Sequence, residues 1–324
     1  MAELVDAHDS KSCEATHESS ILSRGIMKKK VVVILGPTAS GKSGLAIELA
    51  KKFSGEVVSA DSRQVYRHLN IGTGKITTKK MRGIKHHLLD VASPRKQFTV
   101  VQYKNLAEKA MKEITKRGKL PIICGGTGFY IQAIVDNIIL PNVLANQKLR
   151  KSLGKKSVAE LAEILQKLDR ERAKNIDLKN SRRLIRAIEI AKALGKVPNI
   201  KKQQNDFEFL QIGIKTPDKI LRKKISIRLF ARISRGMIKE TKKLHDRGLS
   251  WKRMEELGLE YRYLAYYLQD KMKKAEMIEK LETEIWRYAK RQKTWFKKDK
   301  RTQWFGLEKK EKIKRTIKKF ITGV

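Results

Sequence analysis

A glycine-rich segment near the start of the chain carries the clearest chemical pattern. Residues 36–43 read Gly36-Pro37-Thr38-Ala39-Ser40-Gly41-Lys42-Ser43, which satisfies GxxxxGK[ST]. Its glycines let the backbone curl so that several amide N–H groups point at one anion, while Lys42 adds a positive charge and Ser43 offers a hydroxyl ligand to Mg²⁺. The segment therefore predicts a site for a di- or triphosphate, without revealing which phosphate compound it binds.

A carboxylate, Asp61, directly follows the next strand-like segment, residues 56–60. Because the carboxyl ends of parallel strands meet at one edge of a sheet, we expect Asp61 to lie near the bound phosphates. Three interpretations are open from the residues alone. Asp61 could bind Mg²⁺ through water, remove a proton from an acceptor nucleophile, or cap the N-terminus of a helix.

The elements around these residues predict an α/β fold. Residues 31–35 are a continuous apolar run of strand length, which is typical of a central parallel strand, and an apolar pattern of helical spacing follows the phosphate loop. Residues 121–124 form another strand of the buried type. We therefore expect a parallel-sheet core of the P-loop NTPase-like class.

The character of the chain changes after about residue 137, where strand signals thin out. Residues 159–168 and 182–190 are amphipathic helices, residues 207–214 give a final strand, and the chain from Pro217 onward reads as helical and basic. We predict a catalytic core over residues 28–137 and 206–305, a helical insertion domain over residues 138–205, and a basic C-terminal helix over residues 306–324. Residues 1–27 are polar and aperiodic, and Met27 is the expected start.

Composition points to an anionic partner. The 324 residues contain 74 Lys and Arg against 34 Asp and Glu, a formal net charge of +40. Basic side chains that neutralise phosphates release condensed counterions, so a nucleic acid is the favoured partner. Two cysteines exclude a disulfide framework, and no apolar run reaches the roughly 18 residues of a membrane span. We expect a cytoplasmic protein with no membrane association.

Several separate segments resemble one enzyme family. Residues 61–66 and 70–75 (DSRQVY and NIGTGK) are similar to DSxQVYxxxDIGTxK, and residues 86–90 (HHLLD) belong to a second block. Residues 125–130 (GGTGFY) resemble a GGTGLY loop, and residues 287–296 (RYAKRQKTWF) resemble RxYAKRQxTWF. The chain thus resembles bacterial tRNA dimethylallyltransferases, also called tRNA isopentenyltransferases, from about Val31 to about Phe305.

The resemblance implies a reaction and its residues. The family transfers a dimethylallyl group from dimethylallyl diphosphate to the N6 amine of the adenosine 3′-adjacent to the anticodon, in tRNAs that read codons beginning with U. By resemblance, Asp61 is the general base, Thr127 lies by the bridging oxygen of the diphosphate, and Arg228 reaches the same diphosphate. Taken as sequence alone, Arg228 reads as a solvated helix charge. Residues 36–43 would bind the diphosphate, with Ser43 on Mg²⁺ as the one cofactor.

The resemblance also implies contacts with the anticodon stem-loop of a tRNA, made by a monomer. At the adenine we expect Asp61, Ser62, Arg63 and Gln64. In the insertion we expect Arg150, Arg182, Arg183 and Arg186, for which packing and solvation are the alternatives. In the C-terminal region we expect Lys290, Arg291 and Gln292.

Other classes of protein remain as alternatives. A P-loop nucleotide kinase would use the same loop, but a convincing strand-plus-Asp partner for Mg²⁺ is missing. An adenylate isopentenyltransferase would prenylate a free nucleotide, which the strong basicity disfavours. A catalytically inert RNA-binding protein is disfavoured by the intact Lys42, Ser43, Asp61 and Thr127.

Overall fold

A parallel sheet forms the centre of the molecule. The computed structural model describes residues 28–199 and 204–323, and within them six strands pair in the order β3-β2-β4-β1-β5-β6, each pair parallel. The strands are β1 (Lys29–Leu35), β2 (Gly55–Ala60), β3 (His86–His87), β4 (Leu120–Gly125), β5 (Phe207–Lys215) and β6 (Gln303–Gly306). The predicted α/β class with a parallel sheet is confirmed.

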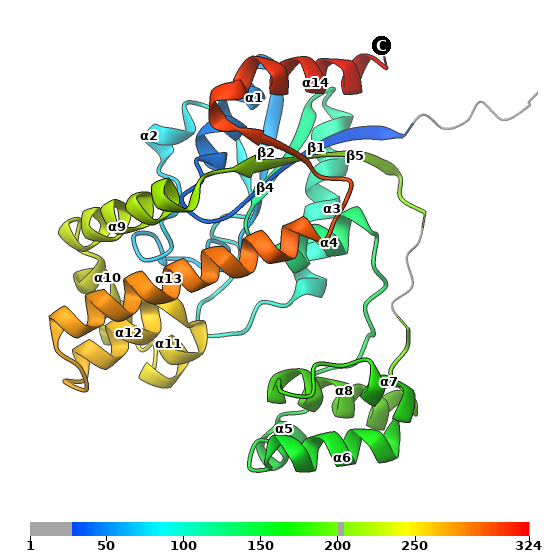
Figure 1. The fold of residues 1–324 in the computed structure, drawn as a ribbon, viewed down its shortest axis with the longest axis vertical. Coiled ribbons are helices and arrows are strands. Elements are labelled where there is room, and N and C mark those ends of the chain that lie inside the picture. The colour runs from blue at the N-terminus through cyan, green and yellow to red at the C-terminus, as the bar shows by residue number, and fades with distance from the viewer. Residues whose placement is uncertain (1–27, 200–203, 324) are drawn as a thin grey trace, which may run out of the picture.

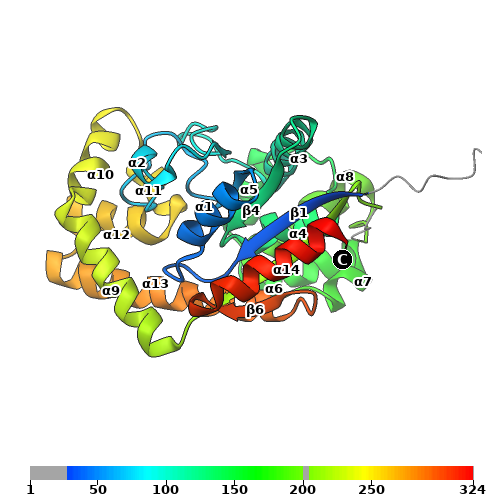
Figure 2. The same cartoon turned by 90° about the horizontal axis from the view of Figure 1, so that it is seen from above.

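Strand β1 lies inside the sheet because its side chains are apolar on both faces. Val31, Val33 and Leu35 pack into a cluster with α3 (Val100–Lys116) and α4 (Gly128–Val135). Val32 and Ile34 face a second cluster with α1 (Lys42–Lys52) and α14 (Lys310–Thr322). Successive side chains of a strand point to opposite faces, so one apolar run packs against helices on both faces of the sheet. Figure 2 shows α14 lying along β1.

A group of helices extends beyond the carboxyl edge of the sheet. It contains α9 (Asp218–Ser234), α10 (Met237–Asp246), α11 (Trp251–Leu257), α12 (Leu259–Leu268) and α13 (Lys274–Lys297). The short α2 (Thr78–Met81) lies in the segment between β2 and β3. Helix α13 runs back from this group to the sheet, as Figure 1 shows, and ends with Phe296 in the cluster under β1.

The insertion forms a separate helical domain with its own core. Its helices are α5 (Gln147–Leu153), α6 (Val158–Leu168), α7 (Arg170–Lys174) and α8 (Ser181–Leu194). Leu161, Leu165, Leu184 and Ile188 are fully buried together. Figure 1 shows this insertion domain set apart from the sheet and reached through two chain segments. The predicted helices over residues 159–168 and 182–190 are confirmed by α6 and α8.

One prediction for the C-terminal region is wrong. Residues 207–214 were expected to be the last strand, yet β6 follows α13 and pairs with β5. A four-residue strand is too short to give a periodic signal, and its formation depends on the free edge of β5. The expected helix over residues 306–324 begins with a single 3₁₀ turn, η1 (Leu307–Lys309), before α14, whose Ile313 and Ile317 are buried against the sheet. The predictions for residues 1–27 lie outside the described residues.

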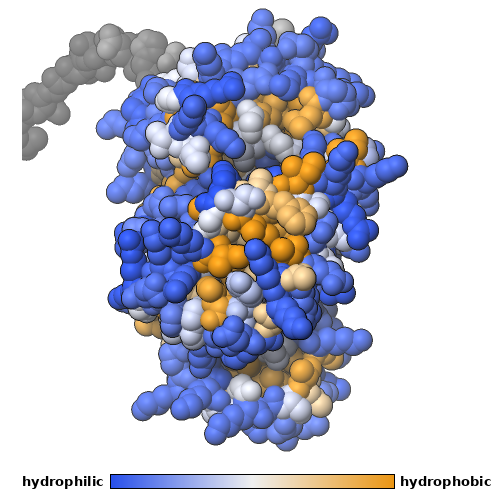
Figure 3. All heavy atoms as spheres, turned by 90° about the vertical axis from the view of Figure 1, so that its left-hand side faces the viewer, coloured by the Kyte–Doolittle hydropathy of each residue, from blue (hydrophilic) through white to orange (hydrophobic). Residues whose placement is uncertain are grey.

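The surface is mostly hydrophilic, with some apolar side chains gathered on one side. Figure 3 shows the side on which α9 lies, and α9 exposes Ile220, Ile227 and Phe230. Within the described ranges, no helix combines the length and the apolar character needed to cross a membrane.

Candidate active site

The phosphate loop has the backbone that its glycines predict. Gly41, the residue before α1, has φ 90°, a region that L side chains rarely adopt, and a Cβ there would come within 2.5 Å of Leu307. The loop brings the first turn of α1 to the carboxyl end of β1. Lys42 Nζ donates to the carbonyl of Pro37 at 3.0 Å. Burial lowers the pKa of Lys42, while the nearby Asp61 charge opposes that shift.

A cavity of about 1180 Å³ opens beside this loop. Its walls come from the phosphate loop and α1, from the ends of β2 and β4, from the segment before α2, and from α9. Among its lining residues are Gly41, Lys42, Ser43, Ser59, Gln64, Gly74, Lys75, Thr77, Cys124, Arg228 and Arg232. The cavity is therefore lined by the anion-binding loop and by additional cations from α9. Such a lining suits a ligand that carries phosphates.

Asp61 directly follows β2, between Ser59 and Gln64, which both line this cavity. Its Oδ1 accepts the backbone N–H groups of Arg63 at 2.9 Å and Gln64 at 3.3 Å. Its Oδ2 accepts no hydrogen bond among the residues that the structure describes. The helix-cap interpretation of Asp61 is wrong, because a turn and not a helix follows this residue. One carboxylate oxygen fixes that turn, and the other can take a proton. Lys42 and Cys124, which line the cavity, are close enough to interact with this charge.

Thr127 connects the end of β4 to the Asp61 segment. Its Oγ1 accepts the backbone N–H of Ser62 at 2.9 Å, and its own N–H donates to the carbonyl of Ala60 at 3.1 Å. The Tyr288 hydroxyl lies near Thr127, and burial raises the pKa of Tyr288, so that this phenol stays protonated. The hydroxyl of Thr127 is therefore fixed beside the expected base.

A single glutamine of α13 holds the two loops together. Gln292 is 6% exposed; its Oε1 accepts the N–H of Thr38 at 2.8 Å, and its Nε2 donates to the carbonyl of Gly126 at 2.8 Å. A Cβ on Gly126 would lie 2.3 Å from Nε2, so glycine is what lets α13 approach this closely. We call this arrangement the Gln292 bridge. It fixes the phosphate loop relative to the loop that carries Thr127.

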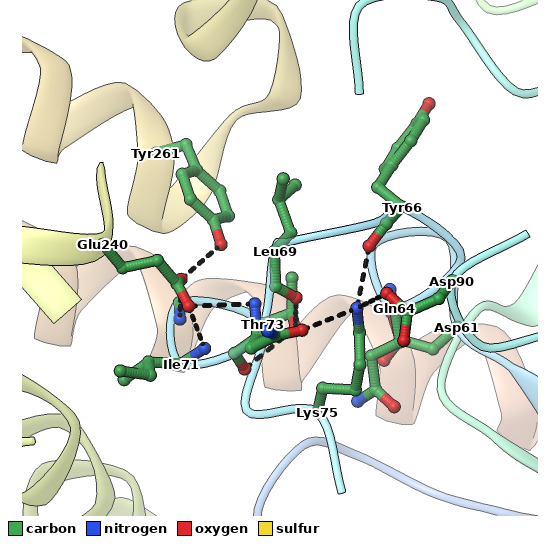
Figure 4. Close-up of polar contacts among 12 residues, drawn as sticks. Asp61, Gln64, Tyr66, Leu69, Ile71, Thr73, Lys75, Asp90, Glu240 and Tyr261 are labelled. Carbon is green, nitrogen blue, oxygen red and sulfur yellow. Dashed lines mark hydrogen bonds and ion pairs between the residues drawn. The ribbon is translucent and has the colours of Figure 1, made fainter. Parts of the chain in front are cut away.

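A carboxylate of α10 holds the backbone of the segment before α2. Glu240 of α10 accepts the N–H groups of Asn70 at 3.1 Å, Ile71 at 2.7 Å and Gly72 at 3.0 Å, and it also accepts the Tyr261 hydroxyl at 3.0 Å. Figure 4 shows Glu240 and Tyr261 on one side of this segment and Asp61 on the other. The contacts fix a segment whose continuation lines the cavity.

Lys75 fixes the far end of the same segment. Its Nζ donates to the carbonyl of Tyr66 at 2.8 Å and to Asp90 Oδ1 at 2.6 Å, as Figure 4 shows. The Lys75 side chain is 5% exposed and that of Asp90 is 48% exposed, so a buried lysine reaches its carboxylate partner at the surface. Residues 70–75, which carry part of the family resemblance, thus form part of the cavity wall, and these hydrogen bonds hold them in place.

Arg228 reaches the cavity from α9. Its Nη2 lies against Gly74, where a Cβ would come within 3.2 Å, and it makes no hydrogen bond or ion pair within the described ranges. The neighbouring Arg232 donates to the carbonyl of Gly72 at 2.7 Å and pairs with Glu260 at 2.8 Å. Of these two arginines, Arg232 is used in the fold and Arg228 is available to an anion.

The candidate RNA contacts on α13 separate into two groups. Lys290 and Arg291 are exposed, with Lys290 Nζ 5.7 Å from the centre of the Trp286 ring. Gln292 is buried in the bridge described above. The expected direct contact of Gln292 with RNA therefore conflicts with its position, because both ends of its amide are occupied by backbone groups.

The arginines of the insertion also separate. Arg150 and Arg186 both donate to Glu189, which is 2% exposed; the Arg150 Nη2–Oε2 distance is 2.7 Å. Arg186 also donates to the carbonyl of Val143 at 2.9 Å. By contrast, Arg182 and Arg183 are exposed at the start of α8. None of these four is brought to the cavity, so they stay candidates for contacts remote from the reacting atoms.

Three residues of this site were missed from the sequence: Tyr288, Glu240 and Gln292 in its bridging role. Tyr288 and Gln292 are four residues apart on α13, a spacing that places both side chains on one face of a helix. That spacing, inside a block already singled out, could have indicated a buried polar pair. Glu240 offers no such signal, since the backbone N–H groups that it holds lie 168–170 residues away.

Comparisons with known proteins agree on one family. The model of the IPP transferase family matches residues 64–299. The chain is 43% identical over 276 residues to tRNA dimethylallyltransferase 2 of Treponema denticola, covering 84% of this chain and 92% of that protein. It is 37% identical over 307 residues to tRNA dimethylallyltransferase of Bacillus mycoides, covering 92% and 96%.

Solved structures give the same answer. The tRNA isopentenylpyrophosphate transferase of Bacillus halodurans superposes with a TM-score of 0.70 at 35% identity, covering 91% of this chain and 98% of that one. A eukaryotic dimethylallyltransferase, in a structure described as acting on tRNA, superposes with a TM-score of 0.78 at 26% identity, covering 91% and 80%. By sequence and by fold, this chain belongs to the IPP transferase family.

Proposed function

We propose that this chain transfers the dimethylallyl group of dimethylallyl diphosphate to the N6 amine of the adenosine 3′-adjacent to the anticodon, in tRNAs that read codons beginning with U. The observation that carries the proposal is the position of Asp61. One of its oxygens is anchored by two backbone N–H groups, the other is available, and Thr127 and the phosphate loop are fixed at the same edge of the sheet.

The phosphate loop accounts for the leaving group. As the allylic carbon–oxygen bond breaks, negative charge develops on the departing diphosphate. The N–H groups of residues 41–43, Lys42 and Arg228 lie at the cavity and stabilise that charge, while the Thr127 hydroxyl serves the bridging oxygen. Because the Gln292 bridge and Glu240 fix these groups in advance, little reorganisation is needed when the bond breaks.

Mg²⁺ fits the same cavity. Ser43 is exposed at the first turn of α1 and lines the cavity, and Mg²⁺ commonly takes few protein oxygens together with phosphate oxygens and water. Ser43 would hold the ion, which would supply charge neutralisation at the diphosphate. Asp61 keeps its separate role as the base.

Asp61 accounts for the acceptor. The lone pair of an adenine amine is delocalised into the ring, so the amine is a weak nucleophile until its proton is removed. Asp61 Oδ2 takes that proton as the new carbon–nitrogen bond forms. The neighbouring Ser62, Arg63 and Gln64 are half-buried along the same turn and line the path of the base, which must leave its stack to reach them.

The net positive charge of the chain supports a tRNA, and not a free nucleotide, as the acceptor substrate. A net charge of +40 suits a polyanion, and the matched relatives are named as enzymes of tRNA. We propose that one monomer, working in the cytoplasm, holds one anticodon stem-loop. Arg182, Arg183, Lys290 and Arg291 are the exposed candidates for phosphate contacts.

The test is prenylation by purified protein. Wild type, Asp61→Asn and Asp206→Asn are incubated with unmodified tRNA, dimethylallyl diphosphate and Mg²⁺, and the nucleosides are analysed by mass. Asn keeps an oxygen for the two N–H groups but is no base, so turnover should fall about 10²–10⁴-fold. Asp206, an exposed carboxylate far along the chain, should lose nothing when changed. Consumption of ATP or prenylation of AMP, with tRNA unmodified by wild type, would contradict the proposal.

A further inference from the structure

A second cavity, of about 260 Å³, is lined by Arg67 and His68, which follow the Asp61–Tyr66 segment in the chain. It shares no lining residue with the phosphate-loop cavity. Arg67, His68, Arg95 and Arg247 surround it, and the apolar side chains of Leu244 and Leu249 form part of its wall. We call it the arginine cavity. No residue given a role so far contributes to it.

The charges around the arginine cavity are not balanced. Its three arginines are exposed, and none of its lining residues is acidic. Arg95 Nη2 donates to the backbone carbonyl of Arg247 at 2.5 Å, which holds the Arg95 side chain against the chain that carries Arg247. The guanidinium groups of Arg67 and Arg247 have no hydrogen-bond or ion-pair partner in the described part of the chain. Three cations around one hollow repel one another, and an anion that accepts their N–H groups removes this repulsion.

The walls of the arginine cavity are built in advance. Arg253 of α11 donates to the carbonyls of Pro94 at 2.8 Å and Lys96 at 3.0 Å, which fixes the stretch that carries Arg95. The N–H of Arg67 donates to the carbonyl of Ala92 at 2.9 Å. Leu244 and Leu249 are 6% and 3% exposed and anchor the end of α10 in the core. A ligand here would meet arginines whose backbone positions are already fixed.

The position of the arginine cavity selects its ligand. Arg67 follows Asp61 by six residues, so their Cα atoms are at most about 22 Å apart. A polynucleotide whose adenosine lies at Asp61 therefore passes within reach of Arg67. Planar guanidinium groups match the geometry of phosphate oxygens, and exposed cations bind a polyanion by displacing its counterions.

We propose that the arginine cavity is a phosphate subsite, which holds a backbone phosphodiester of the RNA whose adenosine is at Asp61. The inference rests on the proposed function, because it names a contact made by the same substrate. It assigns Arg67 and Arg247 as the two principal donors, with Arg95 held beside them.

The experiment measures the salt dependence of tRNA affinity. Arg67→Gln, Arg247→Gln and the double variant are compared with wild type by filter binding between 50 and 200 mM KCl. Each phosphate contact contributes about 0.9 to the slope of log affinity against log salt. With one contact removed, the factor by which tRNA affinity drops between 50 and 200 mM KCl should be about 3.5-fold smaller than for wild type. In the double variant the two reductions should multiply.

Arg315→Gln is the matched control, since Arg315 is an exposed arginine of α14 that lines neither cavity. It changes the net charge equally and should leave the slope unchanged. Equal slopes for all variants would overturn the subsite, as would tight binding of inorganic phosphate by wild type with no slope change for tRNA. If wild type prenylates tRNA in that case, only the subsite fails; if wild type does not, the proposed function fails independently.

Discussion

The α/β body and the insertion domain both contain many basic residues, but they use them differently. In the body, Lys42 and Arg228 line a cavity, and Arg228 has no carboxylate partner in the described ranges. In the insertion domain, Arg150 and Arg186 converge on the buried Glu189. A basic residue is available to a substrate only where the fold leaves it unpaired. The number of cations in a region therefore says less about binding than the number of their carboxylate partners.

The largest effect should come from the Gln292 bridge, which keeps the cations and N–H groups of the body in place. Gln292→Leu removes both hydrogen bonds and leaves the Thr38 N–H and the Gly126 carbonyl without them. Because misplacement by about 1 Å can cost 10²-fold in rate, we expect a loss of about 10²-fold in kcat/KM for dimethylallyl diphosphate. Steady-state kinetics of tRNA prenylation measure it.

Two variants give this prediction its controls. Gln292→Glu keeps the acceptor for Thr38 but cannot donate to Gly126, so its rate should fall between those of wild type and Gln292→Leu. Gln269→Leu removes only local hydrogen bonds, one to the Ala265 carbonyl and one from Lys271, and should keep the wild-type rate. A Gln292→Leu enzyme with wild-type kinetics would show that the two loops hold their positions without the bridge.

A smaller effect should follow from neutralising Glu189, the carboxylate that pairs with Arg150 and Arg186 in the insertion domain. Glu189→Gln leaves Arg150 and Arg186 without their carboxylate. Breaking a buried pair costs about 3–5 kcal/mol, and the partial exposure of both arginines reduces this to about 2 kcal/mol. Hydrogen exchange of the α5 and α8 amides should report that loss of local stability, while Glu163→Gln, an exposed change on α6, should not.

The same carboxylate predicts a pH dependence. Burial alone would raise the pKa of Glu189, but hydrogen bonds from Arg150 and Arg186 outweigh it and lower the pKa. The stabilisation is therefore complete above the ordinary pKa of a glutamate and is lost as the pH falls through the lowered value. Protection of α8 should decrease with acid in wild type and depend less on pH in Glu189→Gln. An identical pH profile in both would contradict the assignment.

The smallest effect should distinguish paired from unpaired arginines directly. Arg182→Gln removes an exposed charge that has no carboxylate partner in the described ranges, so it should lower the tRNA salt slope by about 1. Arg183, whose Nη1 lies 3.9 Å from Asp177 Oδ2, should lower it by less when changed to Gln. Arg150→Gln removes an arginine that is engaged with Glu189 and should destabilise α5 without that change in slope. If Arg150→Gln lowers the slope as much as Arg182→Gln, pairing does not decide which arginine meets RNA.

Sequence reasoning succeeded where the signal is contiguous. Residues 36–43 contain the whole phosphate loop, and the apolar run before it is enough to define a central strand. The order of functional segments at the sheet edge follows from the rule that parallel strands end together. These features depend on short stretches of chain, so a sequence displays them directly.

Sequence reasoning failed where two segments far apart in the chain must come into contact. Gln292 and Thr38 are 254 residues apart, and Arg150 and Glu189 are 39 apart. Composition shows that such groups are polar or charged, but only the fold shows whether a partner satisfies them. Strand β6 was missed for a related reason, since four residues become a strand only when an open edge of β5 is present.

The attachment of the insertion domain has a consequence for engineering and for the history of the fold. Where the chain leaves α4 and where it returns to β5, Asn137 Nδ2 donates to the Gln204 carbonyl at 2.9 Å, and Asn205 Nδ2 donates to the Ile134 carbonyl at 2.8 Å. Exit and entry are therefore side by side, and a short turn could join them. The intervening helices behave as a cassette, which could be exchanged or deleted by recombination without disturbing the order of strands that forms the catalytic edge.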